Sequence, residues 1–103
     1  MSHKMSVKGV TEAEETIIKN IIAPLSETYD FYYYGSRVKG NFRQLSDLDL
    51  MIKGEKEAPS NIISKLKNDF DSSFLPYVVN IADFYTLNEN FYNIIKDDLV
   101  KVI

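Results

Sequence analysis

The stretch YGSRVKGNFRQLSDLDLMI, residues 34–52, decides the fold because it joins the end of one strand, a tight turn and a second strand. Before it, the aromatic run from Phe31 to Tyr34 is typical of a strand that is covered on both faces, and Gly35 ends that strand. Acidic and apolar residues then alternate from Asp47 to Lys53, which predicts a second strand with a single apolar face. One face would carry Asp47, Asp49 and Met51, and the other Leu48, Leu50 and Ile52.

Helical patterns lie on either side of this stretch. Thr11 and Glu14 form a capping box, followed by isoleucines at helical spacing, so we expect a helix from about Glu12 to Ile22. The other expected elements are a helical turn over 36–40, a helix over 60–70, a strand within 74–84, a helix over 88–96 and a short edge strand over 99–103. This order predicts an α/β (α+β) fold in which helices flank a small mixed β-sheet. We expect a flexible N-terminal tail over residues 1–10 and one domain over 11–103.

Composition excludes several classes of protein. The 103 residues suffice for one domain, and an apolar share of 45% indicates a chain that folds. No apolar run approaches the roughly 18–20 residues of a membrane helix, and the first residues lack the apolar core of a signal peptide. There is no cysteine, and the single histidine, His3, lies in the expected tail. A net charge of −3 argues against a surface built for nucleic acid. We expect a cytoplasmic protein without membrane or direct nucleic-acid contacts.

The central stretch also carries the candidate chemistry. Gly35 at a strand end allows backbone to approach a phosphate closely, and Ser36 adds a hydroxyl donor at the start of a helical turn. Arg37 would add positive charge there, or pair with a surface acid instead. Asp47 and Asp49, two residues apart on a strand, share one face at about 6–7 Å, a spacing suited to joint ligation of Mg²⁺.

Each half of this pattern also has a plain structural explanation. Gly-Ser is common in ordinary turns, and alternating acids often form the solvated face of a strand. The two halves together, at strand ends and with ten residues between Ser36 and Asp47, favour a nucleotide and metal site. Phosphoryl and nucleotidyl transfer need such a site, because metal ions offset the charge that builds on phosphate oxygens.

At these residues the chain resembles the DNA polymerase beta superfamily, whose members share the pattern GSx10DxD. It is most similar to the minimal nucleotidyltransferases, short prokaryotic proteins often encoded beside a helical HEPN-type protein as antitoxin and toxin. The segments GSRVKG (35–40) and SDLDL (46–50) carry the likeness, which extends over most of the chain. The resemblance implies a polymerase-beta-type fold and transfer of AMP from ATP, with Mg²⁺, to a tyrosine hydroxyl of the HEPN partner. Gly35 and Ser36 would bind the triphosphate, and Asp47 and Asp49 would act as the catalytic metal ligands.

One position departs from the family's pattern. A third carboxylate usually follows on the strand after the middle helix, and alignment puts Asn80 in its place. An asparagine carbonyl can ligate a metal, but it brings no charge and takes no proton. Asp83 lies nearby, yet strand alternation turns it to the opposite face unless a bulge swings it inward.

Two interpretations therefore stay open. Either the enzyme works with two carboxylates and Asn80 as ligands, or the chain is a weakened or inactive member that acts on a helical partner by binding alone. Transfer to a small molecule such as an aminoglycoside is a third, for which the chain has no substrate domain. The sequence leaves open whether the chain also forms a homo-oligomer.

Overall fold

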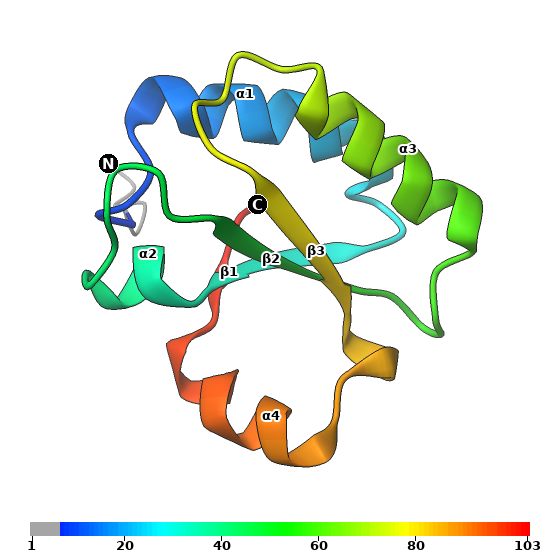
Figure 1. Ribbon diagram of the computed structural model, residues 1–103. Coiled ribbons are helices and arrows are strands. Elements are labelled where there is room, and N and C mark those ends of the chain that lie inside the picture. Colours follow the sequence, from blue (N-terminus) through cyan, green and yellow to red (C-terminus); the bar gives the residue numbers. More distant parts are fainter. Residues whose placement is uncertain (1–6) are drawn as a thin grey trace, which may run out of the picture.

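The computed structural model describes residues 7–103, which form a four-stranded sheet with helices on both sides (Figure 1). The helices are α1 (Glu12–Ile22), α2 (Ser36–Lys39), α3 (Ser60–Asp71) and α4 (Glu89–Ile95). The strands are β1 (Asp30–Tyr34), β2 (Leu48–Lys53), β3 (Val79–Asp83) and β4 (Val100–Lys101). Short 3₁₀ turns follow α1, β3 and α4, at Ala23–Leu25, Phe84–Thr86 and Lys96–Asp98. No helix within residues 7–103 is both long enough and apolar enough to cross a membrane.

The sheet is mixed, as the sequence predicts. Its strand order is β3-β2-β1-β4, with β2 parallel to β3 and the other pairs antiparallel. The parallel pair is joined through α3, which lies beside α1 on one face of the sheet, while α4 lies on the other (Figure 1). Asp49 stands opposite Tyr34 on β1 and opposite Asn80 on β3. This register places Tyr34, Asp49 and Asn80 in one row across three neighbouring strands, at the predicted site.

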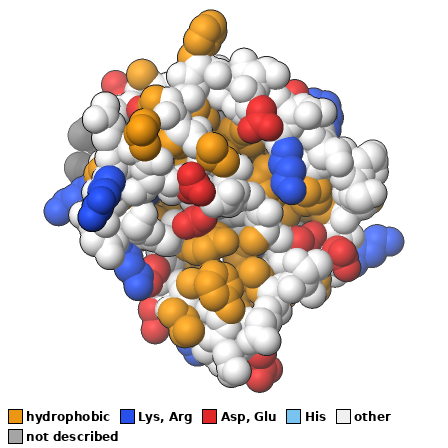
Figure 2. Space-filling view, in the orientation of Figure 1, with side chains coloured by type: hydrophobic (Ala, Val, Ile, Leu, Met, Phe, Trp, Pro, Cys, Tyr) orange, Lys and Arg blue, Asp and Glu red, His pale blue; other side chains and the backbone are white. Residues whose placement is uncertain are grey.

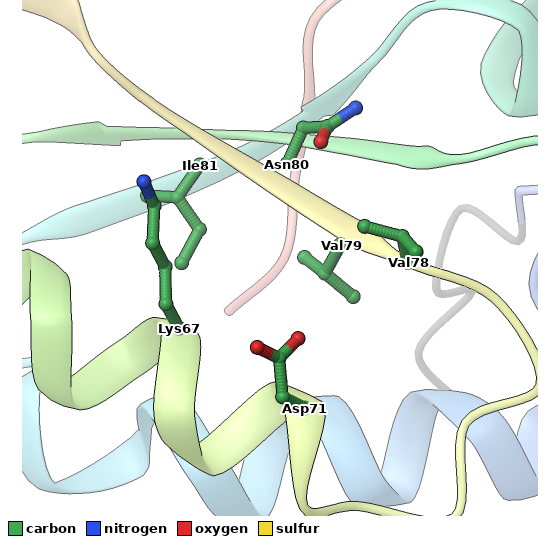
Figure 3. A pocket seen from close by; sticks show the side chains of 6 residues that line it. All are labelled: Lys67, Asp71, Val78, Val79, Asn80 and Ile81. Carbon is green, nitrogen blue, oxygen red and sulfur yellow. The ribbon is translucent and has the colours of Figure 1, made fainter.

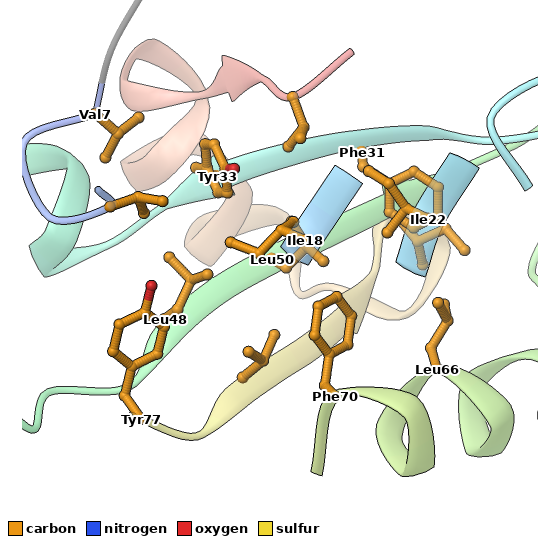
Figure 4. Close-up of a cluster of buried hydrophobic side chains, with 14 of the residues drawn as sticks. Val7, Ile18, Ile22, Phe31, Tyr33, Leu48, Leu50, Leu66, Phe70 and Tyr77 are labelled. Atoms are coloured by element: carbon orange, nitrogen blue, oxygen red, sulfur yellow. The ribbon is translucent and has the colours of Figure 1, made fainter. Parts of the chain in front are cut away.

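The main core fills the space between the sheet and the pair α1 and α3 (Figure 4). From β2, the side chains of Leu48, Leu50 and Ile52 are completely buried there. They meet residues from both helices, including Ile18, Ile22, Leu66 and Phe70. The capping box of Thr11 and Glu14 is formed in both directions, at 3.1 Å each way, which explains why α1 begins where the sequence predicts.

The opposite face of β2 is only partly open, contrary to the expectation of a single apolar face. Met51 is 1% exposed and packs with Tyr34 and Ile95 in a second, smaller cluster under α4. Alternation correctly predicts the direction in which Met51 points, but it cannot predict that a helix from the end of the chain covers that residue. The uncovered part of this face is therefore the end at Asp47 and Asp49.

The predicted flexible tail over residues 1–10 needs correction in its last part. Residues 1–6, and with them His3, lie outside the described residues. Val7 and Val10, however, are buried in the main core, and the Gly9 amide donates to the Arg37 carbonyl at 3.1 Å. Because two apolar side chains gain burial there, the packed domain extends back to Val7.

Candidate active site

Three predicted residues converge at the open end of the sheet. The Asn80 side-chain amide (Nδ2) donates to Asp47 Oδ2 at 3.0 Å and to Asp49 Oδ1 at 3.3 Å. One nitrogen atom thus contacts both carboxylates, so their oxygens face a common point. Asp47 lies just before β2 rather than within it, and it is exposed, whereas Asp49 is half-buried. The loop that precedes β2 therefore has to position Asp47.

Gly35 lies directly against Asp49 in this site. Its φ of 85° lies in a region that residues with a side chain rarely adopt. A Cβ atom at this position would also collide with Asp49 Oδ2. The turn after β1 can lie against the carboxylate only because glycine stands at this position. The predicted glycine and the predicted acid therefore touch each other.

Ser36 begins α2 directly after this glycine. The Gly35 carbonyl accepts hydrogen bonds from the Val38 and Lys39 amides at 3.0 and 3.1 Å. The Ser36 and Arg37 amides precede these bonds, so they have no acceptor within α2 itself. They and the Ser36 hydroxyl directly follow Gly35, the residue that lies against Asp49.

The charges of the site are unfavourable as they stand. Burial raises the pKa of Asp49, as does the neighbouring charge of Asp47, while the hydrogen bond from Asn80 lowers it. Burial, together with the charge of Asp49, also raises the pKa of Tyr34 to about 12. Two close carboxylates with one neutral donor between them are a favourable environment for a cation.

The donor set fits Mg²⁺ in type. Rotation of the Asn80 amide by half a turn would direct its carbonyl oxygen to the place its nitrogen now holds, giving three hard oxygen donors with the two acids. Within residues 7–103, no group of three or more His, Cys, Asp or Glu side chains is arranged to hold a metal. The candidate site therefore depends on two acids, an amide and, when a substrate is bound, its phosphate oxygens.

Arg37 does not lie where the sequence analysis places it. Its side chain is 4% exposed, and its guanidinium donates to the carbonyls of Gly9, Arg43, Gln44 and Ser46. Its guanidinium is directed to these carbonyls and, within residues 7–103, pairs with no acid, so the prediction that it binds nucleotide needs correction. A four-residue helix shows no periodicity from which its buried side could be predicted.

Asp83 is likewise held away from the site. Its carboxylate accepts from the Ala58 amide at 2.8 Å and from the Tyr85 amide at 2.9 Å. The pairing of β3 with β2 is regular from Val79 to Asp83, so no bulge turns Asp83 inward. Asp83 fixes the connections before α3 and after β3 and does not replace the missing carboxylate.

Beside the site, the free edge of β3 borders a hollow of about 250 Å³ (Figure 3). Val79 and Ile81 turn toward α3, and Asn80 turns away from it (Figure 3). The hollow is also lined by Lys67 and Asp71 of α3. The sequence gives no signal for these two residues, because charged side chains are common on an exposed helix face. In Figure 2, acidic side chains lie in the middle of the visible face, next to a hydrophobic area over α4.

Comparison with known proteins shows the family of this chain and the likeness of its fold. The family described as "Nucleotidyltransferase domain" matches residues 15–103. A Haemophilus influenzae protein named "Probable protein adenylyltransferase MntA" is 37% identical over 93 residues, which cover 90% of this chain and 82% of the relative. The crystal structure of a "putative nucleotidyltransferase" from Sulfolobus solfataricus superposes with a TM-score of 0.50 and 16% identity, over 84% of this chain and 77% of that one. The last likeness concerns the fold alone.

Proposed function

This chain belongs to the nucleotidyltransferase domain family, a family of enzymes, and from that premise we propose that it is a Mg²⁺-dependent protein adenylyltransferase. It would transfer AMP from ATP to a tyrosine hydroxyl of a protein partner. The observation that carries the proposal is the convergence of Gly35, Asp47, Asp49 and Asn80 on one point at the open end of the sheet. The relative named as a protein adenylyltransferase supports the choice of reaction.

The proposed roles follow the chemistry of each group. The backbone at Gly35 and the amide and hydroxyl of Ser36 would bind the triphosphate, since they donate hydrogen bonds without adding bulk. Asp47, Asp49 and the Asn80 carbonyl would hold Mg²⁺. The bound ion would offset the negative charge on the phosphate oxygens.

The reaction balances as a single displacement at phosphorus. The acceptor oxygen forms a bond to the α-phosphorus, and the bond from that phosphorus to the bridging oxygen of the β-phosphate breaks. Pyrophosphate leaves, and the hydroxyl proton passes to a base. Asn80 cannot be that base, because a side-chain amide does not take up a proton near neutral pH. An aspartate or a solvent molecule therefore has to accept the hydroxyl proton.

The acceptor in this proposal is a helical HEPN-type protein encoded nearby, and its modification would make this chain an antitoxin in the cytoplasm. The resemblance to minimal nucleotidyltransferases supports this assignment. The carboxylates lie at the open end of the sheet, and Asp47 is exposed, so a protein hydroxyl has access to them.

Incubation with labelled ATP, Mg²⁺ and the neighbouring gene product tests the proposal. Label should pass to the partner, and mass spectrometry should find AMP on a tyrosine. Asp47→Asn should abolish transfer, and so should removal of Mg²⁺ by EDTA. Absence of label from the partner, or equal labelling by Asp47→Asn, would contradict the proposal.

A second candidate function is a binding module that neutralises its partner without chemistry. It is favoured by one observation: a neutral amide, not a carboxylate, lies between Asp47 and Asp49. Asn80→Asp discriminates between the two functions. A large gain from a near-zero rate supports the binding module, whereas a change of a few-fold or less means that the two carboxylates suffice.

A further inference from the structure

We propose that Arg37 is a positioning residue that holds Asp47 in place through the loop over residues 43–46. The inference rests on the proposed function, because it assigns Asp47 to the metal. It goes beyond that function by giving a role to a buried arginine whose guanidinium donates to backbone carbonyls and not to Asp47, Asp49 or Asn80.

The contacts of the guanidinium concentrate on the residues before Asp47. Nε donates to the Ser46 carbonyl at 2.9 Å, and Nη2 donates to the Gln44 carbonyl at 2.8 Å and to the Arg43 carbonyl at 3.4 Å. Ser46 directly precedes Asp47. The loop is also closed on itself, since the Arg43 amide donates to Ser46 Oγ at 2.8 Å and the Ser46 amide to the Arg43 carbonyl at 3.0 Å.

Asp47 depends on this loop more than Asp49 does. Asp49 lies inside β2 and is paired on both sides, with Tyr34 and with Asn80. Asp47 lies outside the strand and is exposed, and the first ladder bond after it is from the Leu48 amide to the Val78 carbonyl, at 2.8 Å. The position of its carboxylate is therefore set on one side by β2 and on the other by Ser46, which Arg37 holds.

The arrangement requires an arginine in particular. The fourth bond runs from Nη1 to the Gly9 carbonyl at 2.6 Å, so one planar group reaches two separate chain segments. The centre of the guanidinium lies 3.9 Å from the Tyr77 ring centroid and 5.1 Å from that of Phe42. A lysine offers three donors from one point and stacks less well, so it cannot maintain the same contacts.

Gly9 offers an independent way to disturb Arg37. A Cβ atom at this position would collide with Arg37 at its Cα, Cβ and Cγ atoms. Gly9→Ala therefore displaces the arginine while leaving its chemistry intact. Gly9 is far from Arg37 in the sequence, and its amide and carbonyl are both hydrogen-bonded to Arg37 and not to Asp47 or Asp49.

The test compares Arg37→Lys and Gly9→Ala with the matched control Arg43→Lys, in which the same exchange is made at an exposed side chain. Without metal, hydrogen exchange should accelerate at the amides of residues 43–47 in the first two variants and remain as in the wild type in the control. Amides within α1 should stay protected in all three.

Calorimetric titration with Mg²⁺ and ATP should show weaker metal binding in the first two, by about 10–100-fold, the usual effect of removing a group that orients a ligand. With the partner present, kcat should fall at limiting Mg²⁺ while KM for ATP at saturating Mg²⁺ changes little.

Each result decides the matter. Equal loop exchange and equal metal affinity in Arg37→Lys and Arg43→Lys would overturn the positioning role, as would faster exchange spread evenly over α1 and the loop, which would make Arg37 a general stabiliser. If Arg37→Lys fails to fold, Gly9→Ala gives the same comparison. Failure of the proposed function is separate: the wild type would then neither bind Mg²⁺ nor transfer AMP, whereas the loop exchange would still report on Arg37.

Discussion

The two faces of β2 differ in what they contribute. On the face toward α1 and α3, Leu48, Leu50 and Ile52 are completely buried in a continuous apolar core. On the other face, Asp47 and Asp49 lie at the open end, and only Met51 is covered. β2 and the residue before it thus provide stability on one side and the proposed metal ligands on the other. Substitutions on the two faces should therefore separate stability from activity.

The largest effect is expected at Asp49. Asp49→Asn removes a charged ligand from the proposed metal site, so the transfer rate should fall on the order of 10³-fold, equivalent to about 4 kcal/mol of transition-state stabilisation. The fold should persist, because Asn keeps the size of the side chain and can still accept from Asn80. Transfer of labelled AMP and circular dichroism check both parts. Asp97→Asn, at an exposed position in the turn after α4, is the matched control and should keep the wild-type rate.

Leu50→Ala should have the opposite profile. Removing a completely buried leucine leaves a cavity and costs about 3 kcal/mol of unfolding free energy, which lowers Tm by about 15 °C in a domain of this size. The transfer rate per folded molecule should stay near that of the wild type at low temperature. Leu45→Ala makes the same exchange at a side chain that is 73% exposed and should leave Tm almost unchanged. Loss of activity without loss of Tm in Leu50→Ala would mean that the two faces are coupled.

The sequence predicts the buried face of β2 more completely than the open one. Alternation and the capping box are local signals, and they predict the bounds of α1 and the burial of Leu48, Leu50 and Ile52. The open face depends on contacts between distant segments. The burial of Met51 requires α4, and the direction of Arg37 requires Gly9 and Tyr77. Such contacts have no periodicity. The sequence therefore predicted Arg37 at the phosphate site, whereas its side chain is buried against backbone carbonyls.

Gly35→Ala tests how closely the open face is fitted together. Both Gly35 and Gly40 have positive φ, at 85° and 92°, so alanine strains the backbone at either position by about 1–3 kcal/mol. They differ in what a Cβ would meet: Asp49 at Gly35, and nothing within 4 Å at Gly40. Gly40→Ala should therefore lose about 2 kcal/mol of unfolding free energy, and Gly35→Ala at least as much. Only Gly35→Ala should also lose activity, on the order of 100-fold, because it displaces a ligand. Equal activity in the two variants would show that the contact with Asp49 does not matter for transfer.

The smallest expected effect concerns the stability of the open face itself. Because burial and Asp47 raise the pKa of Asp49, the folded chain binds a proton there more tightly than the unfolded chain does. The metal-free fold is therefore penalised at neutral pH, and this penalty disappears as pH falls through the raised pKa toward the unfolded value of about 3.9. Asp49→Asn removes the charge, so at pH 7 it should raise Tm slightly above that of the wild type.

The pH dependence distinguishes this explanation from a general gain in stability. In urea unfolding without metal, the advantage of Asp49→Asn over the wild type should shrink steadily from pH 7 to pH 4. Addition of Mg²⁺ at pH 7 should also remove this difference in stability, because the ion should stabilise the wild type and not the variant. A variant that is less stable than the wild type at pH 7 would mean that the Asp49 carboxylate already stabilises the metal-free fold. The expected outcome would instead mean that the uncompensated charge of the open face favours binding of the proposed metal ion.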